Sequence, residues 1–375
     1  MTELSKGSKV VVIGGGIFGA SSALHLARLG AEVTLVTEGK PGDGASSRSL
    51  SWLNSSRMRS NEYHRLRMLG IDRYRTLSAQ RPGVNWLRFD GGLTWDADDE
   101  SNKIAKVFDH ERSMGYDAVL LAADEVAGVT PGVDASAICK PGAIFNAGEG
   151  WVDLPSLITV LLAEFARLGG KVISDCGPAS VAVTAGRASG IIMADGHRIA
   201  ADAVLVATGA AVPKMAAAVG KRIPDGTLIS LLVKTKPIDV PLRAVLNAPR
   251  VAIRPTPSGA LVLDSAWSER AVSALPDGSY DVKNWVIEEL LEEASAVLVG
   301  HPALELDDIA MGAKPIPEDG VPVLGRLDEV PGYYLAFSHS GATLGLIVGE
   351  LLAGEIMTGA PHPLLAKFRP GRFVG

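Results

Sequence analysis

The sequence predicts an α/β fold organised around a strand, a glycine-rich loop, a helix and a second strand within residues 9–36. Residues 9–13 are a short apolar run rich in valine, as expected of a strand buried on both faces of a parallel sheet. Residues 20–29 are rich in alanine and leucine and precede Gly30, which indicates a helix and its end. Residues 33–36 form a second buried strand.

The loop between the first strand and the helix satisfies G-x-G-x-x-G at Gly14, Gly16 and Gly19, with Ile17 and Phe18 enclosed. Glycines at these places allow a tight turn and let the backbone approach a pyrophosphate. The charge of that group is then stabilised by N–H groups at the helix N-terminus. We therefore predict that these five residues bind a dinucleotide, although the motif alone serves both NAD and FAD.

An acidic residue at the end of the second strand usually binds the ribose hydroxyls of such a dinucleotide. The common spacing places Thr37 at this position, and Glu38 follows one residue later. Either Glu38 binds the ribose or Thr37 makes a weaker contact, and we favour Glu38.

Composition limits the classes of protein to which the chain can belong. A chain of 375 residues is long enough for about two or three domains, and 47% hydrophobic residues can bury a substantial core. The chain has 36 Lys and Arg against 42 Asp and Glu, a net charge of −6. This balance predicts neither a nucleic-acid partner nor binding to an anionic membrane.

The two cysteines, Cys139 and Cys176, are far apart and form no C-x-x-C motif. A disulfide framework, an iron–sulfur cluster and a cysteine-based metal site are therefore not expected. No apolar run reaches the ~18 residues of a membrane helix. Residues 1–9 are polar and the strand after them is interrupted by glycines, unlike a signal peptide. We expect a cytoplasmic protein without an integral membrane segment.

The loop after the second strand, residues 39–53, is dense in small and hydroxyl residues. Its centre is Gly44, Ala45, Ser46, Ser47 and Arg48. Such a segment supplies many N–H and O–H donors and one positive charge, which suits contact with a diphosphate or ribityl chain. The alternative is a flexible surface loop.

The remaining chain alternates between strands and helices. We predict mixed strands and a helix over residues 84–121, with a hairpin at 89–95, and helices at 63–77, 155–168 and 285–298. Strands are expected at 171–173, 180–184, 189–193, 202–207 and 228–235, and a hairpin at 251–263. Arg254 lies inside an apolar strand, where an unpaired guanidinium is costly to bury, so it should face a protein carboxylate or a carboxylate-bearing substrate.

Two further turns are candidates for cofactor contact. Thr208 and Gly209 follow an apolar strand, and their small size lets the strand end approach the adenosine side of a dinucleotide. Ser340, Gly341, Ala342, Thr343 and Leu344 precede or open an apolar helix. Their N–H groups would stabilise negative charge on a bound cofactor.

These motifs together resemble the FAD-dependent D-amino-acid oxidase superfamily, and more narrowly its glycine oxidase, monomeric sarcosine oxidase and D-amino-acid dehydrogenase branch. The resemblance rests on the glycine motif, on GASSRS at residues 44–49 and on residues 332–345. It also rests on residues 311–325, which resemble the family pattern G-x-R-P-x-x-x-D-G-x-P-x-x-G. It covers both ends of the chain and little of the centre.

The resemblance implies a Rossmann-like FAD-binding domain with an interleaved α+β substrate domain built on a mostly antiparallel sheet. The implied FAD-binding domain comprises residues 1–86, 148–225 and 313–375, and the substrate domain residues 87–147 and 226–312. No cysteine stands beside Lys314, where sarcosine oxidases carry the covalent flavin link, so noncovalent FAD is expected.

The candidate catalytic residues are Lys314, Arg254, Arg57 and Arg59. Arg57 and Arg59 match the segment that brings arginines over the flavin in sarcosine oxidases. Lys314 replaces the arginine that anchors the substrate carboxylate in glycine oxidase; it keeps the charge but loses the bidentate fork. The anchor is therefore Lys314, Arg254 or both. The position of the lysine with which sarcosine oxidase activates oxygen matches a place near Val262 in this sequence. No lysine stands there, which puts fast reaction with oxygen in doubt.

The implied activity is FAD-dependent oxidation of the C–N bond of a small amino acid or N-substituted glycine. Glycine, sarcosine, an iminodiacetate-like compound or a D-amino acid would lose a hydride to flavin N5, and the imine would hydrolyse. The expected partners are this substrate, oxygen or another electron acceptor, and a second copy or a redox subunit. The alternatives are an NAD-dependent dehydrogenase, a dehydrogenase subunit serving a protein or quinone acceptor, and a non-catalytic flavin-binding subunit.

Overall fold

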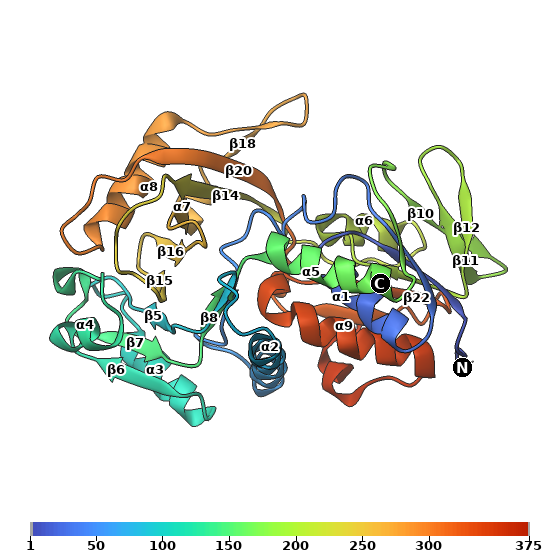
Figure 1. Ribbon diagram of the computed structural model, residues 1–375, viewed down its shortest axis with the longest axis horizontal. Helices are drawn as coiled ribbons and strands as arrows, with labels where there is room; N and C mark the ends of the chain where they lie inside the picture. The colour runs from blue at the N-terminus through green and yellow to red at the C-terminus, as the bar shows by residue number, and fades with distance from the viewer. Residues whose placement is uncertain (1–2, 374–375) are drawn as a thin grey trace. The chain divides into compact units, whose positions relative to one another are not determined.

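The computed structural model describes residues 3–373, and contacts divide them into two compact units (Figure 1). Unit 1 combines the residues up to Ser47 with Leu154–Leu228 and with those from Ala313 onward. Unit 2 combines Arg48–Asp153 with Ile229–Gly312. Each unit is thus assembled from segments far apart in the sequence.

Unit 1 is built on a six-stranded sheet in the order β21-β22-β13-β1-β2-β9. Its strands are β1 Lys9–Ile13, β2 Glu32–Val36, β9 Lys171–Ile173, β13 Ala203–Val206, β21 Val323–Arg326 and β22 Tyr333–Phe337. All neighbours pair in parallel except β21 with β22. The predicted buried parallel strands at 9–13 and 33–36 are confirmed.

The two faces of this sheet are covered differently because side chains alternate along each strand. Val12 faces the helix α1 (Ile17–Arg28), since its Cγ1 lies 3.5 Å from a Cβ placed on Gly19. Val11 and Ile13 pack with Ala188 of the three-stranded antiparallel sheet β10–β12. Unit 1 therefore has α1 on one face of the parallel sheet, and the small sheet together with the short helix α6 (Val212–Ala217) on the other.

The helices of unit 1 are α1, α5 Leu154–Arg167, α6 Val212–Ala217 and α9 Gly341–Thr358; the small sheet is β10 Ser180–Thr184, β11 Arg187–Ile192 and β12 Arg198–Ala200. Short 3₁₀ turns are η3 Gly209–Ala211, η4 Pro363–Phe368 and η5 Pro370–Arg372. α5 and α9 both contact α1 (Figure 1).

Unit 2 contains an eight-stranded, mostly antiparallel sheet in the order β20-β14-β17-β16-β15-β5-β7-β6. Its strands are β5 Gly92–Thr94, β6 Ala118–Leu121, β7 Ala143–Asn146, β14 Leu228–Thr235, β15 Val245–Asn247, β16 Ala252–Pro255, β17 Leu261–Asp264 and β20 Leu306–Lys314. The β16–β17 pair confirms the hairpin predicted at 251–263.

The other elements of unit 2 surround this sheet. The helices are α2 Asn61–Gln80, α3 Ile104–Ser113, α4 Val126–Val129, α7 Ala266–Glu269 and α8 Asn284–Ala296, with 3₁₀ turns η1 Ala123–Glu125 and η2 Ala135–Ala137. The small strands are β3 Trp52–Leu53, β4 Leu87–Arg88, β8 Gly150–Val152, β18 Ser273–Ala274 and β19 Tyr280–Asp281. The core includes Leu93 and Trp95 beside Ile253 and Leu263.

The hairpin predicted at residues 89–95 is wrong. The strands on either side of Gly91 belong to different sheets, because β4 pairs with β8 whereas β5 pairs with β7 and β15. Gly91 has a φ of 89° and turns the chain from one sheet to the other. The pair Gly91-Gly92 therefore marks the point where the chain passes from one sheet to another.

The contacts also group residues 48–86 with unit 2, whereas the sequence places them with the dinucleotide-binding segments. β3 pairs with β8, and Arg67 of α2 donates from Nε to the backbone oxygen of Asn54 at 2.8 Å. These long-range pairings fasten the segment to residues before 154. They leave Ser47 as the last residue of the first segment of unit 1.

The expectation that no segment reaches the length and apolar character of a membrane span is corrected by α9. Its 18 residues pass that test by length and composition, but 78% of them are buried. A mostly buried helix of this kind is typical of a protein core, so the match is weak evidence of a membrane.

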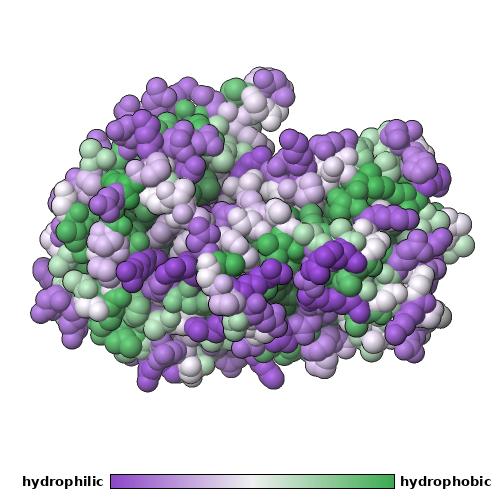
Figure 2. Space-filling view, in the orientation of Figure 1, coloured by the Kyte–Doolittle hydropathy of each residue, from purple (hydrophilic) through white to green (hydrophobic). Residues whose placement is uncertain are grey.

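Exposed apolar side chains such as Trp285 and Met58 lie in different parts of the chain, and Figure 2 shows hydrophilic residues spread over the visible face.

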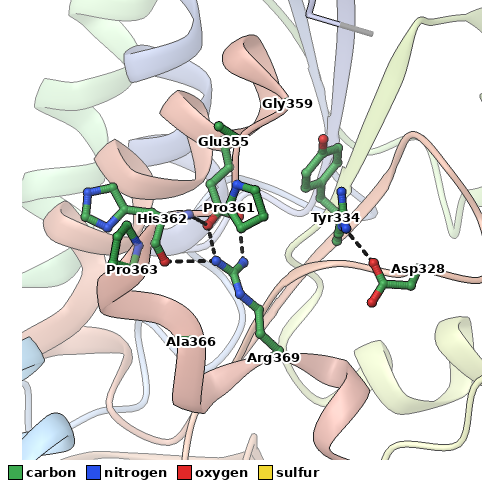
Figure 3. A pocket seen from close by; sticks show the side chains of 11 residues that line it. Asp328, Tyr334, Glu355, Gly359, Pro361, His362, Pro363, Ala366 and Arg369 are labelled. Atoms are coloured by element: carbon green, nitrogen blue, oxygen red, sulfur yellow. Dashed lines mark hydrogen bonds and ion pairs between the residues drawn. The ribbon is translucent and has the colours of Figure 1, made fainter. Parts of the chain in front are cut away.

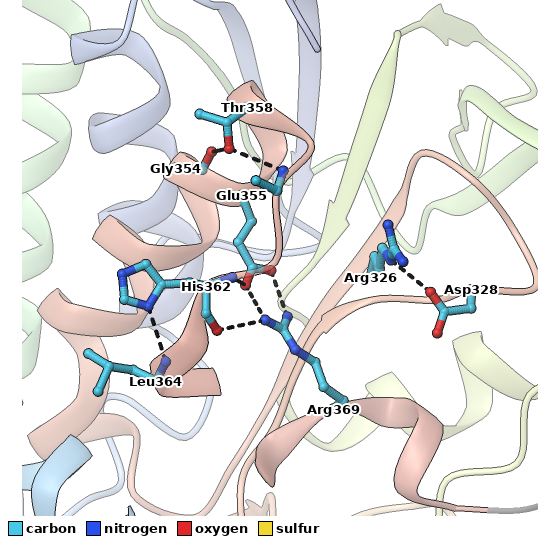
Figure 4. Close-up of polar contacts among 9 residues, drawn as sticks. Arg326, Asp328, Gly354, Glu355, Thr358, His362, Leu364 and Arg369 are labelled. Carbon is cyan, nitrogen blue, oxygen red and sulfur yellow. Dashed lines mark hydrogen bonds and ion pairs between the residues drawn. The ribbon is translucent and has the colours of Figure 1, made fainter. Parts of the chain in front are cut away.

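The C-terminal segment of unit 1 is attached to α9 by a buried ion pair. Glu355 is 4% exposed, and both of its carboxylate oxygens accept from Arg369, with 2.7 Å from Nη1 to Oε2 (Figure 4). Arg369 Nη2 also donates to the backbone oxygen of His362 at 3.0 Å. The pair lines a pocket of about 320 Å³, together with Tyr334 (Figure 3). The pocket adjoins the carboxyl end of α9.

Arg369→Met should lower the free energy of unfolding by about 3 kcal/mol, because the Glu355 carboxylate would stay buried without its partner. The control is Arg28→Met. This change also removes an ion pair, with Glu164, but the Arg28 side chain is 45% exposed. That variant should cost less than about 1 kcal/mol. Urea denaturation measures both, and equal losses would contradict a structural role for the buried pair.

Candidate functional site

The glycine-rich loop of unit 1 turns so closely that two of its glycines cannot carry a side chain. A Cβ on Gly19 would lie 1.8 Å from the backbone oxygen of Gly14. A Cβ on Gly14, whose φ is 114°, would lie 2.3 Å from the backbone oxygen of Ala207. The first glycine therefore lets β1 approach the end of β13, and the last lets α1 approach β1.

Gly16 differs because the space beside it is open. A Cβ there would meet only Ser46 Oγ, at 3.4 Å. Gly16 is the N-cap residue of α1, and Ile17 donates its N–H to Ser46 Oγ at 3.2 Å. Phe18 is the second residue of the helix and is buried. The open space at the helix N-terminus is where a pyrophosphate would bind.

The end of β2 presents Thr37 and Glu38 differently. Thr37 is 7% exposed, and its Oγ1 would lie 2.9 Å from a Cβ on Gly15. Its N–H donates to Ile173 and its backbone oxygen accepts from the Cys176 thiol. Glu38 is exposed one residue later. The hydroxyl of Thr37 thus lies against the loop, and Glu38 is the accessible carboxylate.

The Thr208–Gly209 turn lies beside the glycine loop, since the N atom of Thr208 would be 3.1 Å from a Cβ on Gly14. Thr208 caps the short turn η3, and Gly209 has a φ of 59°. A Cβ on Gly209 would lie 3.9 Å from Cγ of Pro315. The turn therefore joins the loop and the residue after Lys314 within unit 1.

The N-terminus of α9 lies beside the N-terminus of α1. A Cβ on Gly341 would be 3.6 Å from Cγ2 of Ile17, and one on Gly349 would be 2.1 Å from Ser21 Oγ. Ser340 is the N-cap residue of α9, and Ala342, Thr343 and Leu344 lie in its first turn. Two helix N-termini with their partial positive charges thus converge, which favours an anionic or electron-rich ligand.

The serine-rich loop divides between the two units. Ser46 is buried against Ile17, whereas Gly44 and Ser47 are exposed and Ala45 is half-buried. Ser47 Oγ donates to the backbone oxygen of Gly44 at 3.0 Å and closes a turn. Arg48 belongs to unit 2, where its Cδ would lie 2.9 Å from a Cβ on Gly312. Ser46 thus contacts the glycine loop through its side chain, and Gly42 of the serine-rich loop donates its N–H to the backbone oxygen of Gly15.

Arg254 of β16 is a buried cation with unused hydrogen-bonding capacity. It is 4% exposed, and its guanidinium lies 5.2 Å from the ring centroid of Trp151. Nη1 donates to the backbone oxygen of Pro255 at 3.1 Å, and Nε has no hydrogen-bond partner within residues 3–373. Burial lowers the pKa of Arg254 to about 10, against an opposing Coulombic effect of Asp153.

Arg57 and Arg59 lie in a loop of unit 2. Arg57 forms an ion pair with Asp96 at 2.7 Å, and Arg59 Nε donates to the backbone oxygen of Ser56 at 3.2 Å. The guanidinium of Arg59 lies 5.7 Å from the ring centroid of Tyr63. Burial, followed by the nearby charge of Arg67, lowers the pKa of Arg59 to about 10. Lys314, by contrast, is the half-buried last residue of β20 and falls in unit 1.

Sequence reasoning missed two buried carboxylates behind this loop. Glu111 is 2% exposed and Glu149 is fully buried, and both accept backbone N–H groups of the loop. Each looked like an ordinary charged residue, in a helix and in a turn respectively. The one available signal was the placement of Glu149 between Gly148 and Gly150, where a charge stands in an otherwise small and apolar segment.

The site in unit 1 fits FAD. Gly16 leaves the space that a pyrophosphate needs, and Ile17 and Gly341 bring a second helix N-terminus beside the first. A covalent link to FAD would need an available cysteine. Cys139 is enclosed in the core of unit 2, and the Cys176 thiol donates to the backbone oxygen of Thr37 at the end of β2. The residues therefore suit FAD held by noncovalent contacts.

Residues 9–355 match the family profile described as FAD dependent oxidoreductase, DAO. The match spans β1 to the last turns of α9 and therefore most of the chain. It confirms the predictions of the superfamily, of FAD and of an oxidoreductase, and it favours FAD over the alternative of an NAD-dependent dehydrogenase.

Known proteins are similar over nearly the full length. Glycine oxidase from Bacillus licheniformis is 27% identical over 92% of this chain and 92% of its own. One of the subunits of opine oxidase from Agrobacterium tumefaciens is 24% identical over 97% of both chains. The crystal structure of iminodiacetate oxidase from Chelativorans sp. BNC1 superposes with a TM-score of 0.79 at 23% identity, over 96% of this chain and 98% of that one. Its likeness confirms the predicted fold class.

Gly16→Val should abolish retention of FAD, because the side chain would fill the space at the N-terminus of α1 beside Ser46. The visible absorbance of the purified protein measures the bound flavin. Gly354→Ala in α9 is the matched control, since among residues 3–373 no atom beyond its chain neighbours and the backbone of its own helix lies within 4 Å of its added Cβ. A valine variant that stays fully loaded with FAD would disprove the assignment of the loop.

Proposed function

Because the chain belongs to the FAD dependent oxidoreductase family, we propose that it oxidises the C–N bond of a small amino acid or N-substituted glycine. The candidates are glycine, sarcosine, an iminodiacetate-like compound and a D-amino acid. The observation that carries the proposal is Arg254, a guanidinium buried to 4% exposure whose Nε lacks a partner within residues 3–373. A substrate carboxylate would supply that partner.

Arg254 is suited to this task for physical reasons. A guanidinium presents a planar fork to a carboxylate, and such paired hydrogen bonds are stronger than those between neutral groups. Burial excludes competing water and strengthens the attraction. The ring of Trp151 lies beneath the guanidinium and adds a cation–π contact. Lys314 would add a point charge, as a second or alternative anchor.

Once the carboxylate is bound, the reaction depends on placement. FAD, when bound, supplies the flavin N5 atom that accepts a hydride. The α-carbon–hydrogen bond of the substrate breaks while the lone pair of its neutral amine forms a C=N bond. Water then adds to this imine, and the C–N bond breaks to give an oxo acid and an amine. This chemistry needs orientation and exclusion of water more than a general base.

The first turn of α9 has a supporting role in the proposal. Its N–H groups carry the partial positive charge of the helix N-terminus, and Gly341 keeps that end open to close approach. They would stabilise negative charge near the flavin ring. Ser46 and the open space at Gly16 would hold the pyrophosphate, and Glu38 or Thr37 the ribose.

The cations of unit 2 bear on the choice of substrate. Arg57, Arg59 and Arg67 lie close enough for Arg59 to feel the charge of both neighbours, and Arg57 is paired with Asp96. Together with Arg254 and Lys314, these groups suit a substrate with two carboxylates, such as a dicarboxylic secondary amine. The similarity to iminodiacetate oxidase and to an opine oxidase component agrees with this choice.

A second candidate function is that of a dehydrogenase subunit that passes electrons to a protein or quinone, or of a flavin-binding subunit without its own catalysis. The similarity to the opine oxidase component favours this alternative, because that protein is named as part of an assembly. We also expect a cytoplasmic location and leave open a homo-oligomer or a partner redox subunit.

An anaerobic titration tests the proposal directly. Glycine, sarcosine, D-alanine, D-proline and iminodiacetate are added to the yellow holoenzyme, and bleaching of the visible spectrum identifies a substrate. Air is then admitted. Rapid recolouring identifies an oxidase, and slow recolouring that artificial acceptors accelerate identifies a dehydrogenase. A holoenzyme that none of these compounds bleaches would contradict the proposed substrate class.

Arg254→Met should raise the KM for the bleaching substrate by about 100-fold while FAD stays bound. Methionine keeps an apolar contact with Trp151 and removes a buried charge, so the fold should tolerate the change. Arg250→Met is the matched control, since Arg250 also stacks on a tryptophan, Trp267, but is exposed and paired with Glu289 and Glu293. An unchanged KM in the Arg254 variant would place the anchor elsewhere.

Lys314→Met should raise KM by about 30-fold if the lysine shares the substrate carboxylate, again without loss of flavin. Steady-state kinetics should be measured for this variant, for the Arg254 variant and for the double variant. The three KM values show how much each cation contributes to binding the substrate carboxylate. Equal effects of the double variant and the Arg254 variant alone would exclude Lys314 from the anchor.

A further inference from the structure

The loop of residues 55–59, which we call the arginine loop, is held in a strained shape. Arg57 has a φ of 73°, in the left-handed region, which is unfavourable for residues other than glycine. Met58 at the tip is 51% exposed, whereas Ser55 is 1% exposed. A strained segment persists only where its surroundings fix it. Besides the Arg57–Asp96 ion pair and the bonds between Arg59 and His110, two buried carboxylates fix the backbone of this loop.

Glu149 holds the start of the loop. Its Oε1 accepts the phenol O–H of Tyr116 at 2.5 Å and the backbone N–H of Ser55 at 3.3 Å. The Ser55 N–H also lies 3.0 Å from the phenol oxygen, so three groups share one set of hydrogen bonds. Ser55 Oγ continues the network to His64 Nδ1 at 2.8 Å.

Glu111 holds the strained residue itself. Its Oε1 accepts the backbone N–H of Arg57 at 2.6 Å, and its Oε2 accepts from Asn146 Nδ2 at 3.1 Å. Thus Glu111 of α3 and Glu149 of the β7–β8 turn bind backbone N–H groups two residues apart. Neither carboxylate forms an ion pair within residues 3–373 at salt-bridge distance, although positive groups lie nearby.

The protonation of Glu149 follows from this environment. Burial raises its pKa to about 8, against the opposing hydrogen bond from Tyr116, and the charge of Glu111 raises it further. Its Oε2 has no hydrogen-bond partner among residues 3–373. Burial likewise raises the pKa of Glu111, opposed by the Arg57 N–H. The network therefore contains two acids that cannot easily both be charged.

Other charged groups surround the two acids. Arg67 favours the ionised form of Glu149, and Arg57 and His110 favour that of Glu111. Burial and Arg67 lower the pKa of His64, so this imidazole is not an additional cation at neutral pH. Arg59, in turn, feels the charge of Glu149. None of these groups cancels the cost of burying the Glu149 carboxylate.

We propose that Glu149 and Glu111 are positioning residues that hold the arginine loop in place, and that protonated Glu149 keeps the loop closed at neutral pH. When the loop opens, Glu149 meets water and loses its proton readily. Rising pH therefore favours the open loop and withdraws Arg57 and Arg59 from their fixed places. The substrate-binding consequence rests on the proposed function, whereas the opening itself does not.

The direction follows from proton linkage. In the closed state Glu149 titrates near 8, and in an open, solvated state near its ordinary 4.5. Between these values the open state binds fewer protons, so each pH unit multiplies the opening equilibrium by about ten. Above the higher value both states are ionised, and the opening equilibrium becomes constant. Below the lower value both are protonated.

Hydrogen exchange of the holoenzyme tests this proposal, because the Ser55 and Arg57 N–H groups are the donors to the two acids. The protection factor of peptides covering residues 54–60, corrected for the intrinsic exchange rate, should fall by about tenfold per pH unit from about pH 6 to about pH 8. Peptides covering residues 252–264 in the same unit report global unfolding and should not follow this trend.

Glu149→Gln keeps an oxygen for Tyr116 and Ser55 but cannot ionise, so its protection factors should be independent of pH. Glu288→Gln, on the exposed face of α8, is the matched control and should behave as the natural protein. A fall of equal slope in Glu149→Gln, or no fall in the natural protein, overturns the proposal.

Tyr116→Phe provides a second test if the glutamine variant does not fold. The phenol O–H lowers the pKa of Glu149, so its removal should extend the pH-dependent fall to higher pH. An unmoved pH range would overturn the proposal. In the kinetic arm, the KM of the natural protein divided by that of Glu149→Gln should rise with pH, with kcat similar in both, because the division removes the effect of substrate protonation that both proteins share. Exchange results that hold while no amine is oxidised would contradict the proposed function alone.

Discussion

Close approach without side chains is the constraint on which unit 1 depends. Gly19 admits the backbone of Gly14, and Gly349 admits Ser21, each at a distance that no Cβ tolerates. The first approach seats α1 on β1, and the second seats α9 on α1. Because the two helices then begin side by side, their N-terminal N–H groups face one region. Backbone geometry, more than any charged side chain, thus creates the candidate cofactor site.

The sequence predicted what depends on neighbours along the chain. The loop at residues 14–19, the strand and turn at Thr208 and the helix after Ser340 each carry their own local signal of strand, turn and helix. It could not predict which distant segments meet. The Gly91 crossing failed as a hairpin because its flanking strands find partners in β7 and β8. Glu111 and Glu149 were missed for the same reason, since their role arises only where residues 111 and 149 reach Ser55 and Arg57.

Arg254 lies between these cases. Its place in an apolar strand predicted that a partner would be needed, and the structure confirms its burial. The sequence left open whether the partner is a protein carboxylate. Within the described part of the chain the guanidinium forms no ion pair, and its contacts are a backbone oxygen and the face of Trp151. The cost of that burial has no structural compensation comparable to a salt bridge.

The buried charged groups of the two units therefore differ in whether they are paired. In unit 1, Glu355 is paired with Arg369, and Lys221 donates to Glu329 and to the backbone oxygen of Phe373. Such pairs stabilise the fold. In unit 2, Arg254 and Glu149 are buried, each with a polar atom that has no hydrogen-bond partner among residues 3–373, and burial shifts the pKa of each. Stability alone would favour apolar residues at both places, and shifted ionisable groups gather at functional sites. Unit 2 thus carries the groups that we propose for substrate recognition, while unit 1 carries the loop that we propose binds the cofactor.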